Sequence, residues 1–218
     1  ALSLRCIPQL HGAAKRMLSA ARGVIETEMN ACCDNPIIWP EDGEQEAISA
    51  CNADSAYVGM QMDAACIAAV SLAKMSERRN NRLIDGSLSG YPWFCIGEPG
   101  LNSGLMIPQY TQAGLINQMR MLATPSTIDN TPTCGNQEDY VAMGYNACKK
   151  AADMAEKLEY VLAIELLSAF EKQFKYLLRM AAERNNVELL AERTLFPDPF
   201  RSALMQNGVK DGKDLINK

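Results

Sequence analysis

The sequence predicts an all-α fold built from long helices. The segment from Asn136 to Leu178 contains no proline and a single glycine, and its apolar residues recur every three or four positions. Two further segments, 12–31 and 53–83, carry apolar stripes rich in alanine, methionine and leucine. No stretch alternates apolar and polar residues over more than a few positions, so no sheet is expected.

The first helix is expected at Gly12–Ala31, with its basic side chains outside the apolar stripe. The turn sequence Asp34-Asn35-Pro36 ends it. The next segment, Ile37–Ala50, contains Trp-Pro and Asp-Gly pairs and is expected to be a loop.

A second helix is expected from about Ala53 to Leu83 and a third from about Gly104 to Leu122, where Pro125 follows. Two loops adjoin them: the glycine- and proline-rich segment Asp85–Asn102, and Thr124–Gly135.

The last long helix is too long for a compact chain of this size. About 43 residues of helix measure roughly 65 Å, whereas a compact globule of 218 residues is about 45 Å across. Either the helix breaks near Gly144 or helices of neighbouring chains cover it; we favour the second, an elongated bundle assembled across subunits. Residues 1–180 would form the bundle part, and 181–218 a tail of short helices, one of them near Val187–Arg193.

Composition excludes several classes of protein. A net charge of −5 leaves no basic face for a nucleic acid. No run of 18 apolar residues exists, so no membrane-spanning helix is expected. The N-terminal residues do not read as a secretory signal.

Eight cysteines do not form a recognisable site. None lies in a C-x-x-C pair, and the single histidine, His11, cannot complete a Cys/His metal set, so no metal site is predicted. We interpret the cysteines as reduced, small apolar residues, and therefore expect a cytoplasmic protein.

Polar clusters precede two of the predicted helices. Asn102-Ser103 and the run Asn136-Gln137-Glu138-Asp139 are interpreted first as helix N-caps, and alternatively as an anion or oxyanion site at helix N-termini. The run Ser76-Glu77-Arg78-Arg79 is interpreted as a cluster compensating the dipole at a helix C-terminus.

Six blocks of the sequence, taken in order, are specific as a set and cover nearly residues 2–150. They are Ser3–Ala13, Glu28–Ala31, Asp34–Pro36, Ser76–Arg79, Gly100–Gly104 with Ile107–Thr111, and Asn136–Asp139 with Met143. Together they resemble the C-terminal half of the histidine/phenylalanine ammonia-lyase family, and most closely its histidine type.

The resemblance implies an all-α tetramer with long helices bundled across subunits. It implies elimination of ammonia from an α-amino acid with methylidene-imidazolone (MIO), an electrophile that the family forms from an Ala-Ser-Gly tripeptide. It also implies that Arg5 binds the substrate carboxylate, and that Glu138 transfers a proton or faces the substrate side chain. Gln137 is then a second substrate-binding residue, and the Gln137-Glu138 pair is typical of the histidine type.

Three departures limit this expectation. The sequence contains no Ala-Ser-Gly, so MIO would have to come from a missing N-terminal segment or a partner subunit, and the chain alone would be inactive. The family's tyrosine before Ser-Leu-Arg is Leu2, and Ala53 aligns with a phenylalanine. We therefore predict a C-terminal portion or subunit of an MIO-dependent ammonia-lyase or aminomutase. The alternative is an inactive homologue with an oligomerisation or regulatory role.

Overall fold

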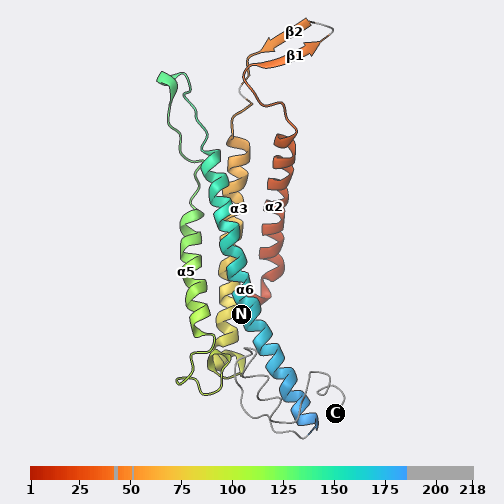
Figure 1. The fold of residues 1–218 in the computed structure, drawn as a ribbon, viewed down its shortest axis with the longest axis vertical. Coiled ribbons are helices and arrows are strands. Elements are labelled where there is room, and N and C mark those ends of the chain that lie inside the picture. The colour runs from red at the N-terminus through yellow and green to blue at the C-terminus, as the bar shows by residue number, and fades with distance from the viewer. Residues whose placement is uncertain (42–43, 51, 186–218) are drawn as a thin grey trace. The chain divides into compact units, whose positions relative to one another are not determined.

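The structure is a computed structural model that describes residues 1–41, 44–50 and 52–185. It is dominated by helices, and the all-α prediction is confirmed (Figure 1). The elements in chain order are α1 (Leu2–Arg5), α2 (Ile7–Met29), β1 (Ile37–Glu41), β2 (Glu44–Ile48), α3 (Ala56–Ile84), α4 (Gly86–Ser89), η1 (Trp93–Cys95), α5 (Met106–Leu122), η2 (Cys134–Asn136) and α6 (Gly144–Asn185).

The chain forms two compact units. The first comprises Ala1–Lys74 and Ile116–Glu159, and the second comprises Met75–Leu115 and the chain from Tyr160 onward. Helices α3, α5 and α6 each contribute residues to both units.

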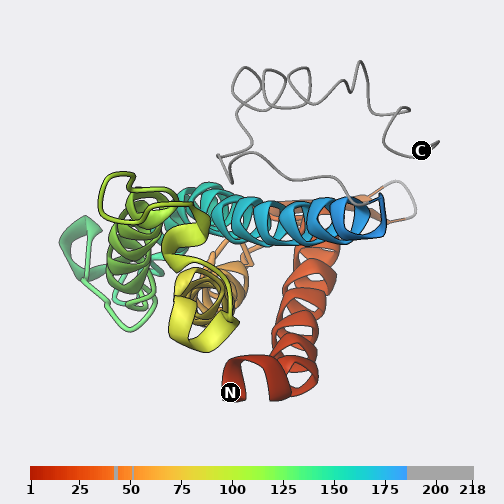
Figure 2. The same ribbon diagram turned by 90° about the horizontal axis from the view of Figure 1, so that it is seen from below.

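In the first unit, α1 is a single turn that bends across the end of α2 (Figure 2). Helix α2 begins with a proline in its first turn, where the missing amide hydrogen has no intrahelical role. Its fully buried residues, Ala14, Ala21 and Val24, recur at helical spacing and define one inner face.

The loop predicted at 37–50 is wrong in part, because most of this segment forms an antiparallel hairpin. Ile37 pairs with Ile48 and Trp39 with Glu46. The run Ile-Ile-Trp favours a strand, and the Asp-Gly pair between the strands in the sequence is one that favours hairpins. The hairpin joins α2 to α3 (Figure 1).

The second unit has its apolar core at the end of α3. Ile84, Cys95 and Leu105 are buried together, and Phe94 packs against them. Gly104 closes this core with φ +51°, and a Cβ there would lie 2.9 Å from the Ile96 side chain, so only glycine fits.

Every predicted long helix exists, but the ends differ. Helix α2 begins at Ile7 rather than Gly12, and α6 covers 42 residues, beginning at Gly144 rather than Asn136 and ending at Asn185. The N-caps predicted at Asn102 and Asn136 are wrong, because α5 and α6 begin four and eight residues later, at Met106 and Gly144. The helix predicted near 187–193 and most of the predicted tail lie outside the described residues.

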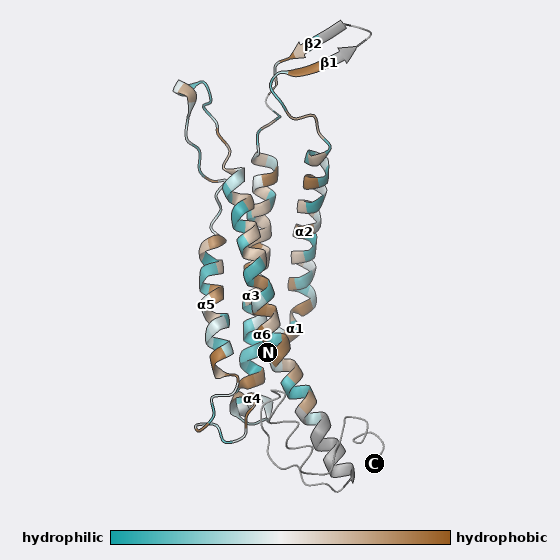
Figure 3. Cartoon of the chain, in the orientation of Figure 1, coloured by the Kyte–Doolittle hydropathy of each residue, from teal (hydrophilic) through white to brown (hydrophobic). Residues whose placement is uncertain are grey.

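Four of the most deeply buried residues of α6 are spaced seven residues apart. Ala147, Met154, Val161 and Ser168 are each at most 1% exposed, as in helices that pack along a narrow seam. Outside this seam, the long helices expose large apolar side chains, and brown segments recur along them in Figure 3. These side chains include Tyr57, Met60 and Ile67 of α3, Ile107, Tyr110 and Met121 of α5, and Leu162, Leu166 and Phe170 of α6.

By length and composition alone, helix α3 is long and apolar enough to cross a membrane, although the sequence holds no run of 18 apolar residues. Its most apolar 18-residue window has a mean hydropathy of 1.4, and 33% of that window is buried. Alanines and methionines raise this average without forming an unbroken apolar run. The same helix buries Asp63, Ser76 and Asn80 in polar contacts with other helices and loops of their units, a pattern that core helices of bundles also show.

Candidate functional site

The loop between α5 and α6, residues 123–143, carries two of the three predicted site residues, Gln137 and Glu138. In Figure 1 this loop is the green segment that extends beyond the end of α5 before the chain enters α6. Every residue from 128 to 140 is exposed. The loop belongs to the first unit.

Hydrogen bonds across the loop hold its two arms together. The amide of Thr133 donates to the carbonyl of Glu138 at 2.8 Å, and the Thr133 hydroxyl donates to Glu138 Oε2 at 2.8 Å. Below this pair, the Asn130 side chain accepts from the amide of Val141 at 2.9 Å and donates to the carbonyl of Asp139 at 3.3 Å. The loop is therefore a braced structure, with the Glu138 carboxylate oriented by a hydroxyl donor.

The tip of the loop is a left-handed turn. Cys134, Gly135 and Asn136 have φ of +51°, +64° and +69°. Such residues cost roughly 1–2 kcal/mol each unless they are glycine, and Asn tolerates the conformation better than most. Gln137 returns to the right-handed region with φ −74°. Strain of this kind is concentrated at functional sites in proteins.

The base of the loop is held by a buried carboxylate, Asp63 of α3, which is 4% exposed. Its Oδ2 accepts hydrogen bonds from the amides of Ser126 and Thr127 at 2.8 and 2.9 Å, and from the Thr127 hydroxyl at 2.8 Å. Lys150 Nζ of α6 donates to its Oδ1 at 2.8 Å and also to the carbonyl of Thr124. Burial alone would raise the pKa of Asp63, but the hydrogen bonds from Lys150 and Thr127 outweigh burial and lower that pKa.

Two thiols near this ion pair have raised pKa values. Burial raises the pKa of Cys66 and of Cys148, and the negative charge of Asp63 adds to both shifts. Both thiols therefore stay protonated and unreactive at neutral pH.

Arg5, the third predicted site residue, lies apart from the other two. It is the exposed last residue of α1, and it forms no ion pair among the described residues. In Figure 1, α1 lies near the N label at one end of α2, whereas the tip of the 123–143 loop lies beyond the other end of that helix. Within the described part of one chain, Arg5 and Glu138 are therefore not brought together.

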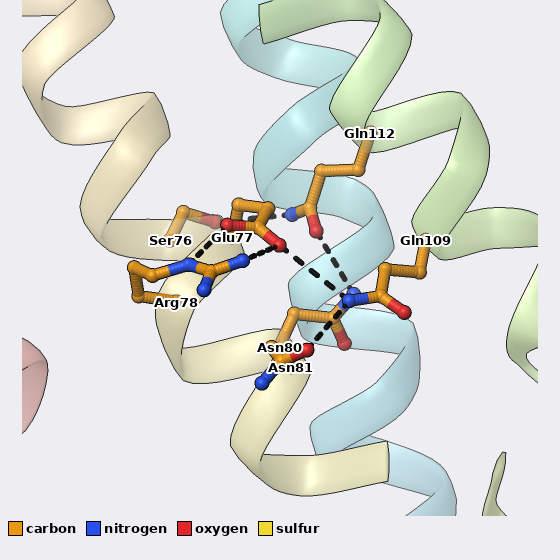
Figure 4. A network of polar contacts seen from close by, with 7 residues as sticks. All are labelled: Ser76, Glu77, Arg78, Asn80, Asn81, Gln109 and Gln112. Carbon is orange, nitrogen blue, oxygen red and sulfur yellow. Dashed lines mark hydrogen bonds and ion pairs between the residues drawn. The ribbon is translucent and has the colours of Figure 1, made fainter. Parts of the chain in front are cut away.

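A second polar cluster lies inside the second unit (Figure 4). The buried Gln112 donates to the carbonyl of Val161 at 2.9 Å and to the Ser76 hydroxyl at 3.4 Å, and accepts from the buried Asn80 amide at 2.9 Å. Gln109 donates to Asn81 at 2.9 Å. The cluster joins α3, α5 and α6.

The interpretation of Ser76–Arg79 as a helix-end cluster is therefore wrong. The run lies more than a turn before the end of α3, and Ser76 is fully buried. Arg79 forms a bidentate ion pair with Glu165 of α6, in which Arg79 Nη2 lies 2.8 Å from Glu165 Oε2. Arg78 pairs with the neighbouring Glu77 instead. This run thus contributes to the unit's interior as well as to its surface.

No group of three or more metal-ligating side chains occurs among the described residues. The family profile of aromatic amino acid lyases matches residues 1–178.

The chain belongs to the aromatic amino acid lyase family.

Curated relatives of this lyase chain are histidine ammonia-lyases. The chain is 41% identical to that of Caldanaerobacter subterraneus over 209 residues, which are 91% of this chain and 41% of the relative. It is 43% identical to that of Caenorhabditis elegans over 169 residues, 78% of this chain and 25% of the relative. The chain therefore spans less than half of the length of each of these relatives.

Solved lyase-family structures share the fold. Histidine ammonia-lyase from Trypanosoma cruzi superposes with a TM-score of 0.77 at 28% identity, covering 100% of this chain and 44% of that one. Phenylalanine aminomutase from Pantoea agglomerans superposes with a TM-score of 0.75 at 27% identity, covering 98% and 43%. The fold is thus common to ammonia-lyases and aminomutases.

The sequence pattern indicated the Gln137-Glu138 pair of the loop, but not the residues that hold the loop in place. Asp63 and Lys150 were not candidates, and neither were Asn80 and Gln112. A signal existed for Asp63, because a single carboxylate within the otherwise apolar run Met62–Val70 has to find a partner when the helix is buried. Nothing in the sequence identified Lys150 as that partner.

Proposed function

We propose that this chain supplies the substrate-binding part of an amino acid ammonia-lyase of the histidine type, which eliminates ammonia to give an unsaturated acid. The observation that carries the proposal is the family match over residues 1–178, together with 41% identity to a histidine ammonia-lyase. The Gln137-Glu138 pair supports the histidine type, because a carboxylate can accept the ring N–H of an imidazole.

Arg5 and Glu138 are assigned complementary roles. The exposed Arg5 guanidinium forms no ion pair among the described residues, so it is available to bind a substrate carboxylate in a bidentate ion pair. Glu138 faces solvent with one oxygen held by the Thr133 hydroxyl, which leaves its other oxygen available for a substrate N–H or a proton. Gln137 beside it would add a neutral hydrogen-bonding group.

The residues of this chain do not fit the role of making the family's electrophile. MIO arises from Ala-Ser-Gly, and this tripeptide is absent from the 218 residues. The group supplies an electrophile that turns the amine into a better leaving group. In our proposal it comes from an N-terminal lyase segment or subunit, and this chain alone has no lyase activity.

We also propose that the site is completed in an oligomer, with a tetramer as the family resemblance implies. Arg5 and Glu138 do not meet within the described part of one chain, so a shared site needs a neighbouring chain. The apolar side chains exposed on α3, α5 and α6 give such neighbours a surface to cover.

One observation favours an alternative, an inactive homologue that assembles with or regulates an active enzyme. Leu2 stands where the family has a tyrosine, and it is 68% exposed with no group able to transfer a proton. Ala53, also exposed, stands where the family has a phenylalanine.

Reconstitution separates these two functions. The chain is mixed with a separately purified N-terminal lyase segment that contains Ala-Ser-Gly, and formation of the unsaturated acid from histidine is followed by absorbance. We expect no turnover by the chain alone and turnover by the mixture. Arg5→Ala should lower kcat/KM roughly 10- to 100-fold through loss of a charge-assisted pair, while Lys15→Ala on the exposed face of α2 should leave it unchanged.

Turnover by the isolated chain would contradict the assignment of the electrophile to another polypeptide. A complex that forms but shows no turnover would favour the inactive homologue. An Arg5→Ala variant as active as the parent mixture would exclude Arg5 as the carboxylate-binding residue.

A further inference from the structure

We propose that Asp63 and Lys150 are positioning residues, which hold both ends of the 123–143 loop and thereby place Gln137 and Glu138 against the substrate. The link to substrate rests on the proposed function. The anchoring itself rests only on contacts within the first unit.

Asp63 fixes the first arm of the loop. Its carboxylate accepts two backbone amides and one hydroxyl from Ser126 and Thr127, directly after the end of α5. Three donors on one buried oxygen define the direction in which the chain leaves the helix.

Lys150 ties the second arm to the first. It lies in the second turn of α6, immediately after the loop, and its ammonium group contacts both Asp63 and the carbonyl of Thr124. One cation thus joins α6, α3 and the first arm. The Lys150 side chain is 17% exposed and that of Asp63 is 5% exposed, so solvent competes weakly for this pair.

Close backbone packing on the same face of α3 adds a second attachment of the loop to this helix. Gly59 precedes Asp63 by one helical turn, and a Cβ at Gly59 would lie 2.8 Å from Gly144 Cα and 2.9 Å from Thr127 Cγ2. Gly144 in turn packs against Ser55. Thr127, in the first arm of the loop, and Gly144, directly after the loop, therefore both pack against the start of α3.

Close packing of these helices does not by itself require a buried ion pair such as Asp63–Lys150. Buried ion pairs often add little net stability, since burial of the charges offsets their attraction, and in some proteins their role is instead to specify one geometry. Because hydrogen bonds also brace the loop internally at Asn130 and at Thr133, the direction of its base sets the position of its tip. We infer that this is the role of the pair.

Hydrogen–deuterium exchange of the 218-residue chain tests the anchor without any activity measurement. Lys150→Met and Asp63→Asn should accelerate exchange in peptides covering 126–141 by roughly 10-fold. Lys150→Arg, which keeps the charge and the donors, should restore slow exchange. The matched control is Glu165→Gln, which breaks the similarly buried Arg79–Glu165 pair and should leave this loop unchanged.

In the reconstituted enzyme, Lys150→Met should lower kcat/KM about 10- to 100-fold, and Lys150→Arg should retain it, because small displacements of catalytic groups are costly. Unchanged exchange in Lys150→Met overturns the anchor, and so does acceleration spread over the whole first unit. If exchange changes as expected but the mixture with the N-terminal lyase segment forms a complex without turnover, the anchor stands and the proposed function fails.

Discussion

Gln112 shows how one buried side chain decides the orientation of its neighbours. The carbonyl of Val161 can only accept a hydrogen bond, so Gln112 must present its NH2 group there and its oxygen to Asn80. Asn80, itself 0% exposed, must then donate to Gln112. This order of donors and acceptors specifies how α3, α5 and α6 pack in the second unit.

Gln112→Leu should therefore lower the free energy of unfolding by about 2–4 kcal/mol, because the buried Asn80 amide loses its partner. Urea denaturation followed by circular dichroism measures this. Gln118→Leu, at an exposed position of the same helix, should change it by less than about 0.5 kcal/mol. Adding Asn80→Leu to Gln112→Leu should recover part of the loss, since it removes the buried Asn80 amide that the first substitution leaves without its acceptor. An equal loss in Gln118→Leu would contradict this account.

The Gln137-Glu138 pair can be proposed as a site from the sequence because a local motif carries it, and its role stays a prediction. Asp63 and Lys150 are 87 positions apart, and nothing local in the sequence records that they meet. Their pairing depends on two helices packing together, which only the three-dimensional structure shows.

Gly59 is a helical residue whose role depends on tertiary packing rather than on helix propensity. It lies inside α3, where glycine is unfavourable by roughly 0.5–1 kcal/mol relative to alanine. Its absence of a side chain lets the first turn of α6 and Thr127 approach the backbone of α3.

Gly59→Ala should lower the melting temperature, because overpacking against backbone costs about 1–3 kcal/mol and outweighs the gain in helix propensity. Gly23→Ala in α2 is the control, since a Cβ there would meet nothing within 4 Å, and it should raise the melting temperature slightly. Differential scanning calorimetry distinguishes the two. A stabilised Gly59→Ala would mean that the close approach is not required.

Helices were predictable from apolar periodicity, and their ends were not. Asn136 to Met143 precede α6 with side chains that would also suit a first helical turn, yet the left-handed residues 134–136 and the Asn130 brace hold this segment in the loop. In the same way, turn-forming residues within the segment of the strands Ile37–Glu41 and Glu44–Ile48 are compatible with a loop as well as with a hairpin, so the local sequence does not decide between the two. Local patterns identify elements, whereas tertiary contacts decide where they stop.

The assembled protein is predicted to cover the apolar residues that one chain exposes. Leu166 and Phe170 lie one turn apart on α6 and are 69% and 58% exposed. Replacing both with glutamate should abolish self-association, or association with the N-terminal lyase segment, as measured by sedimentation velocity. Gln173→Glu on the same helix should not. A parent chain that stays monomeric at about 100 μM and also fails to bind that segment would contradict the prediction, because burial of apolar area drives such contacts.

The left-handed turn at 134–136 has a consequence for how this lyase chain could diversify. At Cys134 and Asn136 the backbone tolerates few replacements, and β-branched residues there would collapse the tip. Gln137, with ordinary dihedral angles, accepts almost any side chain without disturbing the backbone. A library randomised at Gln137 alone should therefore yield mostly folded proteins, whereas one randomised at Cys134 and Asn136 should yield mostly proteins that do not fold correctly.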